Sequence, residues 1–197
     1  MSHWIRCRCG KLQGRLTPPS QVNRCVCYCT DCQAFAHCLK REKEILDAAG
    51  GSDVVQLLPR HVTFTQGLEH LACMRLTPKG LLRWYAACCN TAIGNTPANF
   101  KLSFVGLVAD CLTSEQDSLD EAFGPVRMRV FTRHAKGEPK PKTTGLPGGV
   151  WRAGRMFLTA RLNGDYRKTP FFSESGTPVV APTVLGEQAL HDIKRQL

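Results

Sequence analysis

The segment Cys27-Tyr28-Cys29-Thr30-Asp31-Cys32 is the densest group of cysteines in the chain, with the spacing Cys-x-Cys-x-x-Cys. The residues from Val22 to Cys29 predict a strand, and Thr30 or Asp31 is a typical cap for a helix that follows. A strand ending in Cys-x-Cys can place both sulfurs over its end, and a turn at Thr30-Asp31 returns the third. The segment therefore predicts a metal site built on Cys27, Cys29 and Cys32.

The fourth ligand determines what kind of site this is. Zinc in proteins is tetrahedral, so three thiolates leave one position, and an open position is typical of catalytic zinc. The alternative is a closed structural site, with a fourth ligand from Cys25, Cys38, Cys73 or a histidine. The spacing does not choose between the two, and His37 is the one histidine kept as a candidate pocket residue.

A second candidate site joins Cys7-Arg8-Cys9-Gly10 to Cys88-Cys89. Cys-x-Cys-Gly is typical of a zinc knuckle, because the glycine permits the left-handed backbone that turns amides toward the sulfurs. If residues 88 and 89 were extended, their side chains would lie on opposite faces, so both can bind one ion only in a distorted turn. The alternative is that one or both simply pack in the core.

The cysteine count favours metal over disulfides. Ten of the eleven cysteines precede residue 90, and only Cys111 lies beyond. The total is odd, and no export signal precedes Cys7, so these spacings indicate metal binding in a reducing cytoplasm. No apolar stretch approaches the length of a membrane-spanning helix, which predicts a protein with no membrane contact.

The 197 residues and 43% hydrophobic content suit one globular unit. We predict a mainly β fold: a zinc-binding β domain over residues 1–109 and a basic α/β extension over residues 110–197 packed onto it. The predicted strands are Trp4–Leu16, Val22–Cys29, Val54–Leu58, His61–Thr65, Leu81–Ala87 and Phe100–Val108. The other expected elements are helices over Arg41–Ala49, Val150–Leu162 and Glu187–Leu197, and a loop over Lys136–Gly149.

The three cysteine motifs, together with Arg83-Trp84-Tyr85-Ala86-Ala87-Cys88-Cys89-Asn90, follow a known order and spacing. Over residues 3–108 the chain resembles the glutathione-dependent formaldehyde-activating enzyme (centromere protein V-like) family. The resemblance implies a zinc-bearing β fold of small sheets, with a structural zinc on the outer cysteine pairs and a second zinc on the central trio. It also implies carbon-sulfur lyase chemistry with glutathione and formaldehyde.

The chain departs from the family pattern in its second knuckle. The family has Cys-x-x-Cys-Gly, whose first cysteine falls on Ala86 here and whose glycine is replaced by Asn90. Cys89 matches the second cysteine, and Cys88 is an extra thiol that can substitute for the missing one. Asparagine tolerates the left-handed conformation better than most residues, so the turn can survive.

Charge supplies the remaining hypotheses. The chain carries a net charge of +10, and eleven lysines and arginines lie between Gly124 and Lys168. Arg83 or the arginines of Arg127–Arg133 are candidates to bind the carboxylates of glutathione. The same basic region, with Phe131 and Trp151 available for stacking, fits a nucleic-acid-binding module. A zinc-stabilised scaffold without catalysis is a further alternative.

Overall fold

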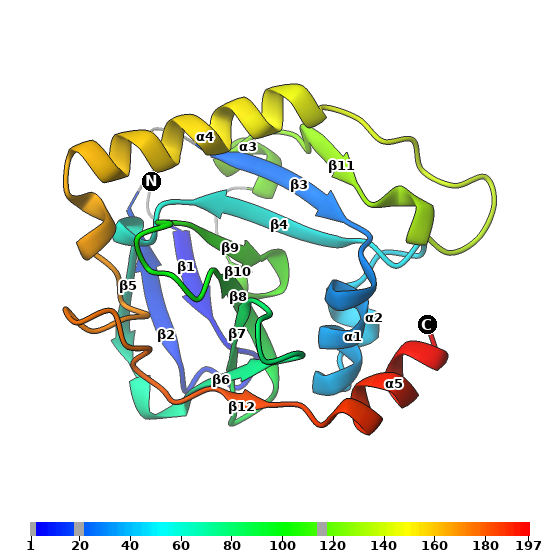
Figure 1. Ribbon diagram of the computed structural model, residues 1–197, viewed down its shortest axis with the longest axis horizontal. Coiled ribbons are helices and arrows are strands. Elements are labelled where there is room, and N and C mark those ends of the chain that lie inside the picture. Colours follow the sequence, from blue (N-terminus) through cyan, green and yellow to red (C-terminus); the bar gives the residue numbers. More distant parts are fainter. Residues whose placement is uncertain (1–2, 18–21, 114–117) are drawn as a thin grey trace.

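The computed structural model describes residues 3–17, 22–113 and 118–197, and two β-sheets form its framework (Figure 1). The smaller sheet has the strand order β10-β1-β2-β5, and the larger has the order β11-β3-β4-β9-β8-β7-β6-β12. Neighbouring strands are antiparallel except β11 with β3 and β12 with β6. The mainly β fold class is confirmed, with strands from both halves of the chain in each sheet.

The strands are β1 (His3–Arg6), β2 (Gln13–Leu16), β3 (Asn23–Cys27), β4 (Ser52–Leu57), β5 (Val62–Gln66), β6 (Leu71–Arg75), β7 (Leu82–Ala86), β8 (Thr91–Thr96), β9 (Val105–Val108), β10 (Leu112–Thr113), β11 (Met128–Val130) and β12 (Thr183–Val184). The α-helices are α1 (Thr30–Leu39), α2 (Glu42–Ile45), α3 (Leu119–Phe123), α4 (Leu146–Leu162) and α5 (Glu187–Arg195). Short 3-10 turns are η1 (Pro59–His61), η2 (Leu68–His70), η3 (Ala109–Cys111), η4 (Thr132–His134) and η5 (Asp165–Arg167).

The main core lies between the two sheets. Ile5 and Leu16 of the smaller sheet pack in one cluster with Val55, Trp84 and Leu107 of the larger sheet, all essentially inaccessible to solvent. The indole Nε1 of Trp84 donates to Thr96 Oγ1 at 2.9 Å, so its polar atom is satisfied in the interior. Apolar burial between the sheets is therefore the principal stabilising term.

The outer face of the larger sheet carries the helices. Side chains alternate along a strand, so Val55 faces the core while its neighbour Val54 faces outward, opposite Val108 on β9. Helix α1 packs on this outer face through Phe35 and Leu39. Helix α4 runs beside β3 along the same sheet (Figure 1). The two helices cover different parts of this face, and the candidate site described below lies between them.

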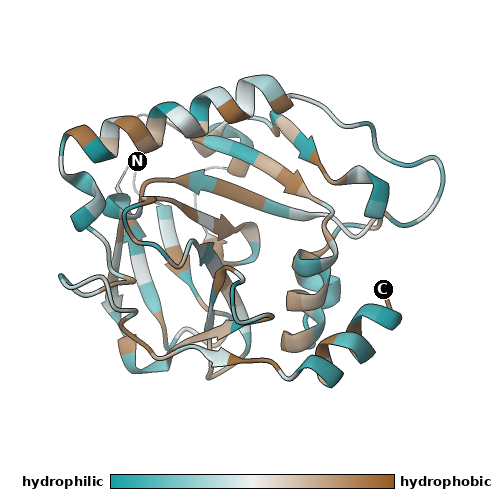
Figure 2. Cartoon of the chain, viewed as in Figure 1, coloured by the Kyte–Doolittle hydropathy of each residue, from teal (hydrophilic) through white to brown (hydrophobic). Residues whose placement is uncertain are grey.

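Apolar and polar contacts anchor helix α4 to the protein body. Met156 and Ala160 are buried against Leu58, and Arg152 Nε donates to Asn23 Oδ1 at 3.0 Å. Figure 2 shows hydrophobic residues recurring along α4, whereas α5 is mostly hydrophilic. None of the helices formed by the described residues combines the length and the apolar character needed to cross a membrane.

Several predicted element boundaries are wrong. Residues 4–16 form two strands, β1 and β2, because the chain reverses after Cys7. The predicted helix over Arg41–Ala49 shrinks to α2, since Leu46 leaves the helix to bridge Ser52. The predicted loop over Lys136–Gly149 ends early, because α4 begins at Leu146 after Gly145, whose φ of 68° requires glycine. Helix α5 ends at Arg195 rather than at the last residue.

Candidate metal centres and the adjoining pocket

The structure brings the four outer cysteines together. Cys7 and Cys9 lie in the turn after β1, and Cys88 and Cys89 lie in the turn between β7 and β8. The Sγ–Sγ distances are 3.6 Å for Cys7–Cys9, 3.7 Å for Cys7–Cys88, 3.3 Å for Cys9–Cys88 and 3.8 Å for Cys88–Cys89. All four sulfurs lie within 4.8 Å of one another.

These separations fit a tetrahedral metal site. Sulfurs bound at about 2.3 Å around a tetrahedral ion stand about 3.8 Å apart, close to the observed contacts. The cluster can hold a metal ion with all four positions filled by the chain. Both turns have the expected backbone: Gly10 has φ 77° and Asn90 has φ 56°, each in the left-handed region. The adjacent residues Cys88 and Cys89 converge because this segment is a turn.

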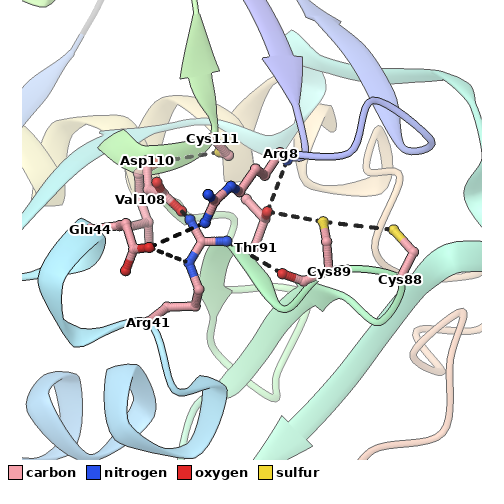
Figure 3. A network of polar contacts seen from close by, with 9 residues as sticks. All are labelled: Arg8, Arg41, Glu44, Cys88, Cys89, Thr91, Val108, Asp110 and Cys111. Atoms are coloured by element: carbon pink, nitrogen blue, oxygen red, sulfur yellow. Dashed lines mark hydrogen bonds and ion pairs between the residues drawn. The ribbon is translucent and has the colours of Figure 1, made fainter.

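Hydrogen bonds hold the outer sulfurs in place (Figure 3). Thr91 Oγ1 lies 3.2 Å from Cys89 Sγ and accepts from the backbone N–H of Arg8 at 3.0 Å. Burial opposes ionisation of Cys89, but hydrogen bonds from Thr91 and Cys9 lower its pKa to about 6. The backbone N–H of Leu12 donates to Cys7 Sγ at 3.2 Å. Such contacts orient and stabilise thiolate ligands.

A buried arginine ties this cluster to the rest of the protein. Arg41 follows α1, and its Nη1 donates to the carbonyl oxygen of Cys89 at 3.3 Å. Its Nη2 lies 3.5 Å from Asp110 Oδ2 and its Nε lies 3.4 Å from Glu44 Oε1 (Figure 3). The second knuckle is therefore linked through Arg41 to α2 and to η3.

The inner trio forms at the junction of β3 and α1. Cys27 ends the strand, Cys29 is the N-cap of the helix, and Cys32 lies in the first turn, with all three sulfurs within 4.8 Å of one another. The predicted cap at Thr30 or Asp31 is wrong by one or two residues. Cys29 Sγ takes that role, accepting from the backbone N–H of Cys32 at 3.4 Å. The sulfur spacing allows one metal ion to contact all three.

The surroundings of the trio favour negative charge on Cys29, whereas the pKa values of Cys27 and Cys32 are raised. Hydrogen bonds from Cys27 and Cys32 lower the pKa of Cys29, and the charge of Arg83 adds to the effect. The N-terminal end of a helix carries partial positive charge, which stabilises a thiolate there. The trio therefore lies where at least one thiolate is stabilised before any ion binds.

Arg83 is the cation whose charge lowers the pKa of Cys29 in the trio. It lies on β7, is only 3% exposed, and donates from Nη1 to Asn95 Oδ1 at 3.1 Å. Its guanidinium carbon lies 5.3 Å from the centroid of the Phe35 ring on α1. The side chain is thus fixed by an amide and an aromatic face. Sequence reasoning proposed Arg83 as a candidate for binding carboxylates, but did not foresee its burial beside the cysteines.

A pocket of about 350 Å³ adjoins the trio. Its floor is the outer face of the larger sheet, contributed by β3, β4, β8, β9 and β11, and its cover is α4. Cys27 and Cys32 line one part of it. Its polar lining comes from the amides Asn23, Gln56 and Asn95, and most of the remaining lining is apolar. The cover was not foreseen, because no local motif in residues 146–157 indicates a pocket.

The reserve ligands do not join either group. Cys25 lines the pocket, but Gln56 Nε2 donates to its sulfur at 3.2 Å and burial raises its pKa to about 12. Cys38 and Cys73 belong to neither cysteine group found among the described residues. His37 does not line the pocket, and its Nδ1 lies 2.9 Å from Glu42 Oε1. These positions correct the sequence-based candidates for a fourth ligand.

The comparisons place the chain in a family. Residues 2–181 match a profile described as "Family of unknown function (DUF6151)". The chain belongs to this family. Its description assigns no activity, so the resemblance to formaldehyde-activating enzymes stays a prediction.

No curated protein matches the sequence. A crystal structure of a Rhodobacter sphaeroides protein aligns with 58% of this chain and 90% of its own, at 12% identity and a TM-score of 0.39.

Proposed function

We propose that this protein holds two zinc ions: a closed structural ion on Cys7, Cys9, Cys88 and Cys89, and an ion at an open site on Cys27, Cys29 and Cys32. The observation that carries the proposal is the difference in cysteine number between the two groups. The outer group has four sulfurs, whereas the inner group has three and adjoins a pocket. Tetrahedral coordination by three protein ligands leaves a position for water or substrate.

The donor set supports zinc as the metal. Thiolate-only sites with tetrahedral spacing suit zinc, whereas oxygen-preferring ions such as magnesium and calcium need carboxylates or carbonyls. A zinc ion with an open position lowers the pKa of a bound thiol or water, or polarises a carbonyl oxygen. Three thiolates give such a centre a net negative charge, which the neighbouring Arg83 would partly offset.

The reaction proposed for the inner site is reversible addition of a thiol to an aldehyde, as in the formaldehyde-activating family that the sequence resembles. In the forward direction a sulfur–carbon bond forms and the carbonyl π bond breaks. The thiol proton ends on the former carbonyl oxygen, so no oxidant or reductant is needed. The reverse step, cleavage of the carbon–sulfur bond, makes the enzyme a carbon-sulfur lyase.

Among the pocket amides, Asn95 is the one that would bind the substrate oxygen in this reaction. Arg83 donates to Asn95 Oδ1, so the amide nitrogen is the group that Asn95 can offer to a substrate oxygen. An N–H group directed at the oxygen would stabilise negative charge that develops there during addition. The sulfurs hold the metal, Arg83 holds Asn95, and Asn95 binds the oxygen.

A cysteine variant tests this assignment. Cys29→Ser should bind one equivalent of zinc fewer than the wild-type chain, because the inner trio loses a ligand while the outer four remain. Formation of a thiol–aldehyde adduct, followed by NMR, should fall to the uncatalysed rate. Elemental analysis by inductively coupled plasma mass spectrometry measures the metal.

Cys38→Ser is the matched control, since Cys38 is a half-buried cysteine on the same helix that belongs to neither cysteine group. It should keep both the zinc and the rate. Full zinc content in Cys29→Ser would contradict the inner site. Two zinc ions without adduct formation in the wild type would instead support the zinc-stabilised scaffold.

A further inference from the structure

The lining of the pocket indicates which substrate the inner site takes. The two cysteines Cys27 and Cys32 lie in it together with three amide side chains and Cys25. The described residues that line it include no lysine, arginine, histidine, aspartate or glutamate: the others are two glycines and ten apolar side chains, among them Val54, Met128, Val150 and Phe157. An apolar wall of this kind binds hydrocarbon and gives no partner to a carboxylate.

The arginines that were candidates to bind a carboxylate do not line the pocket. Arg83 is buried and held by Asn95 and Phe35. Arg129 donates to the hydroxyl of Tyr28 at 3.1 Å, and Arg133 donates from Nε to His134 at 2.9 Å. None of these arginines lines the pocket. Glutathione, with two carboxylates, therefore finds no charge partner in this lining.

Helix α4 builds the apolar cover with a regular stripe. Leu146, Gly149, Val150, Ala153 and Phe157 recur at helical spacing and all line the pocket. Phe157 also packs against Phe104, with ring centroids 6.0 Å apart. The sheet, the helix and the sulfur group thus border an open pocket whose volume is near the lower end of ordinary ligand pockets, about 300–1,000 Å³.

We propose that the substrate of the inner site is an uncharged thiol or aldehyde with a hydrocarbon body, its reactive end at Cys27 and Cys32 and its chain under α4. This inference rests on the proposed function for the position of the reactive end. The hydrocarbon part of the inference rests on the lining alone, so the two can fail separately.

A homologous series of alkanethiols tests the inference. Affinity for the zinc-loaded protein, measured by isothermal titration calorimetry, should rise about fourfold for each methylene added from propanethiol to hexanethiol, the factor expected for burying one methylene. Glutathione should bind far more weakly than hexanethiol. A flat series, or glutathione binding as tightly as hexanethiol, would overturn the proposal.

Two substitutions in α4 test whether the hydrocarbon chain of the ligand binds under this helix. Val150 and Leu158 are similarly exposed, at 62% and 60%, but only Val150 lines the pocket. Val150→Asp should weaken hexanethiol binding about tenfold, because it places a carboxylate at the apolar lining, whereas Leu158→Asp should leave it unchanged. Equal effects of the two substitutions would contradict binding under α4.

Cobalt substitution separates the two proposals. Hexanethiol added to the cobalt-loaded protein should change the visible absorption of the ion, because its sulfur enters the coordination sphere, while hexanol should bind without that change. If both hexanol and hexanethiol bind without a spectral change, the open metal site is refuted and the apolar pocket is still supported. If glutathione and hexanethiol give the same spectral change, the preference for an apolar substrate is refuted and the open metal site is still supported.

Discussion

Asn90 shows how one residue allows the outer cluster to close. The segment Ala87–Asn90 must turn so that Cys88 and Cys89 both reach the sulfurs of the first knuckle. Asn90 has φ 56°, a conformation that asparagine adopts more readily than most side chains. Cys88 then contributes one of the four sulfurs of the outer cluster, since its Sγ lies 3.3 Å from Cys9 Sγ.

Arg83 gives a prediction at the same scale. Arg83→Met removes the buried cation beside the trio, so we expect the affinity of the inner zinc to fall about tenfold, or about 1.4 kcal/mol. Competition with a zinc chelator measures it. The outer zinc, which is held by other residues, is the internal control.

Arg83→Lys keeps the charge but loses the planar guanidinium that meets Asn95 and Phe35. It should recover part of the lost affinity. An Arg83→Met protein that folds and retains inner zinc as tightly as the wild type would contradict the electrostatic role of this residue.

At the scale of the element, the sequence predicts α1 and α4 better than it predicts their neighbours. The Cys-x-Cys-x-x-Cys spacing places the trio at a strand end followed by a helix, which the structure has. Strand β8 was not foreseen, because all six of its residues are buried and it shows no alternation of polar and apolar side chains. Strands β10 and β12 are two residues long, too short to show any period.

Two glycines in α4 give a prediction for that element. A Cβ at Gly149 would lie 2.2 Å from Met128 Sδ, whereas a Cβ at Gly154 would have no atom within 4 Å. Gly149→Ala should destabilise the protein by about 1–3 kcal/mol through overpacking. Gly154→Ala should stabilise it by about 0.5–1 kcal/mol, because alanine is the better helix former.

Chemical denaturation of both variants measures these changes. Equal and small effects at the two positions would show that α4 does not pack closely on β11. Gly149→Ala should also narrow the pocket, since Met128 and Gly149 both line it.

At the scale of the whole molecule, the candidate site joins parts of the chain that no local pattern links. The trio comes from residues 27–32, its buried cation from β7, and the pocket cover from α4, more than a hundred residues after the trio. Each cysteine motif could be predicted from its own spacing. The meeting of Cys9 with Cys88 could also be predicted, because a four-cysteine site joins two such knuckles from distant parts of the chain. The meeting of Cys27 with the pocket could not, since it depends on sheet pairing and helix packing, which sequence spacing does not encode.

The C-terminal part enters this assembly through both sheets. Strand β10 pairs with β1 and strand β11 pairs with β3, while β12 adds to the far edge beside β6. Helix α5 contacts α1, and Lys194 Nζ lies 2.8 Å from Asp31 Oδ1 next to the trio. Residues beyond 109 therefore contribute strands, a pocket cover and a contact near the cysteines.

X-ray absorption spectroscopy at the zinc edge, combined with elemental analysis of the reduced wild-type protein, tests the central claim most directly. Four cysteines at one site and three at the other predict two zinc ions per chain, with an average of about 3.5 sulfur ligands at about 2.3 Å and a light-atom ligand for the remainder. A folded, reduced protein that contains no metal, and whose unfolding temperature does not respond to added zinc or to a chelator, would contradict it.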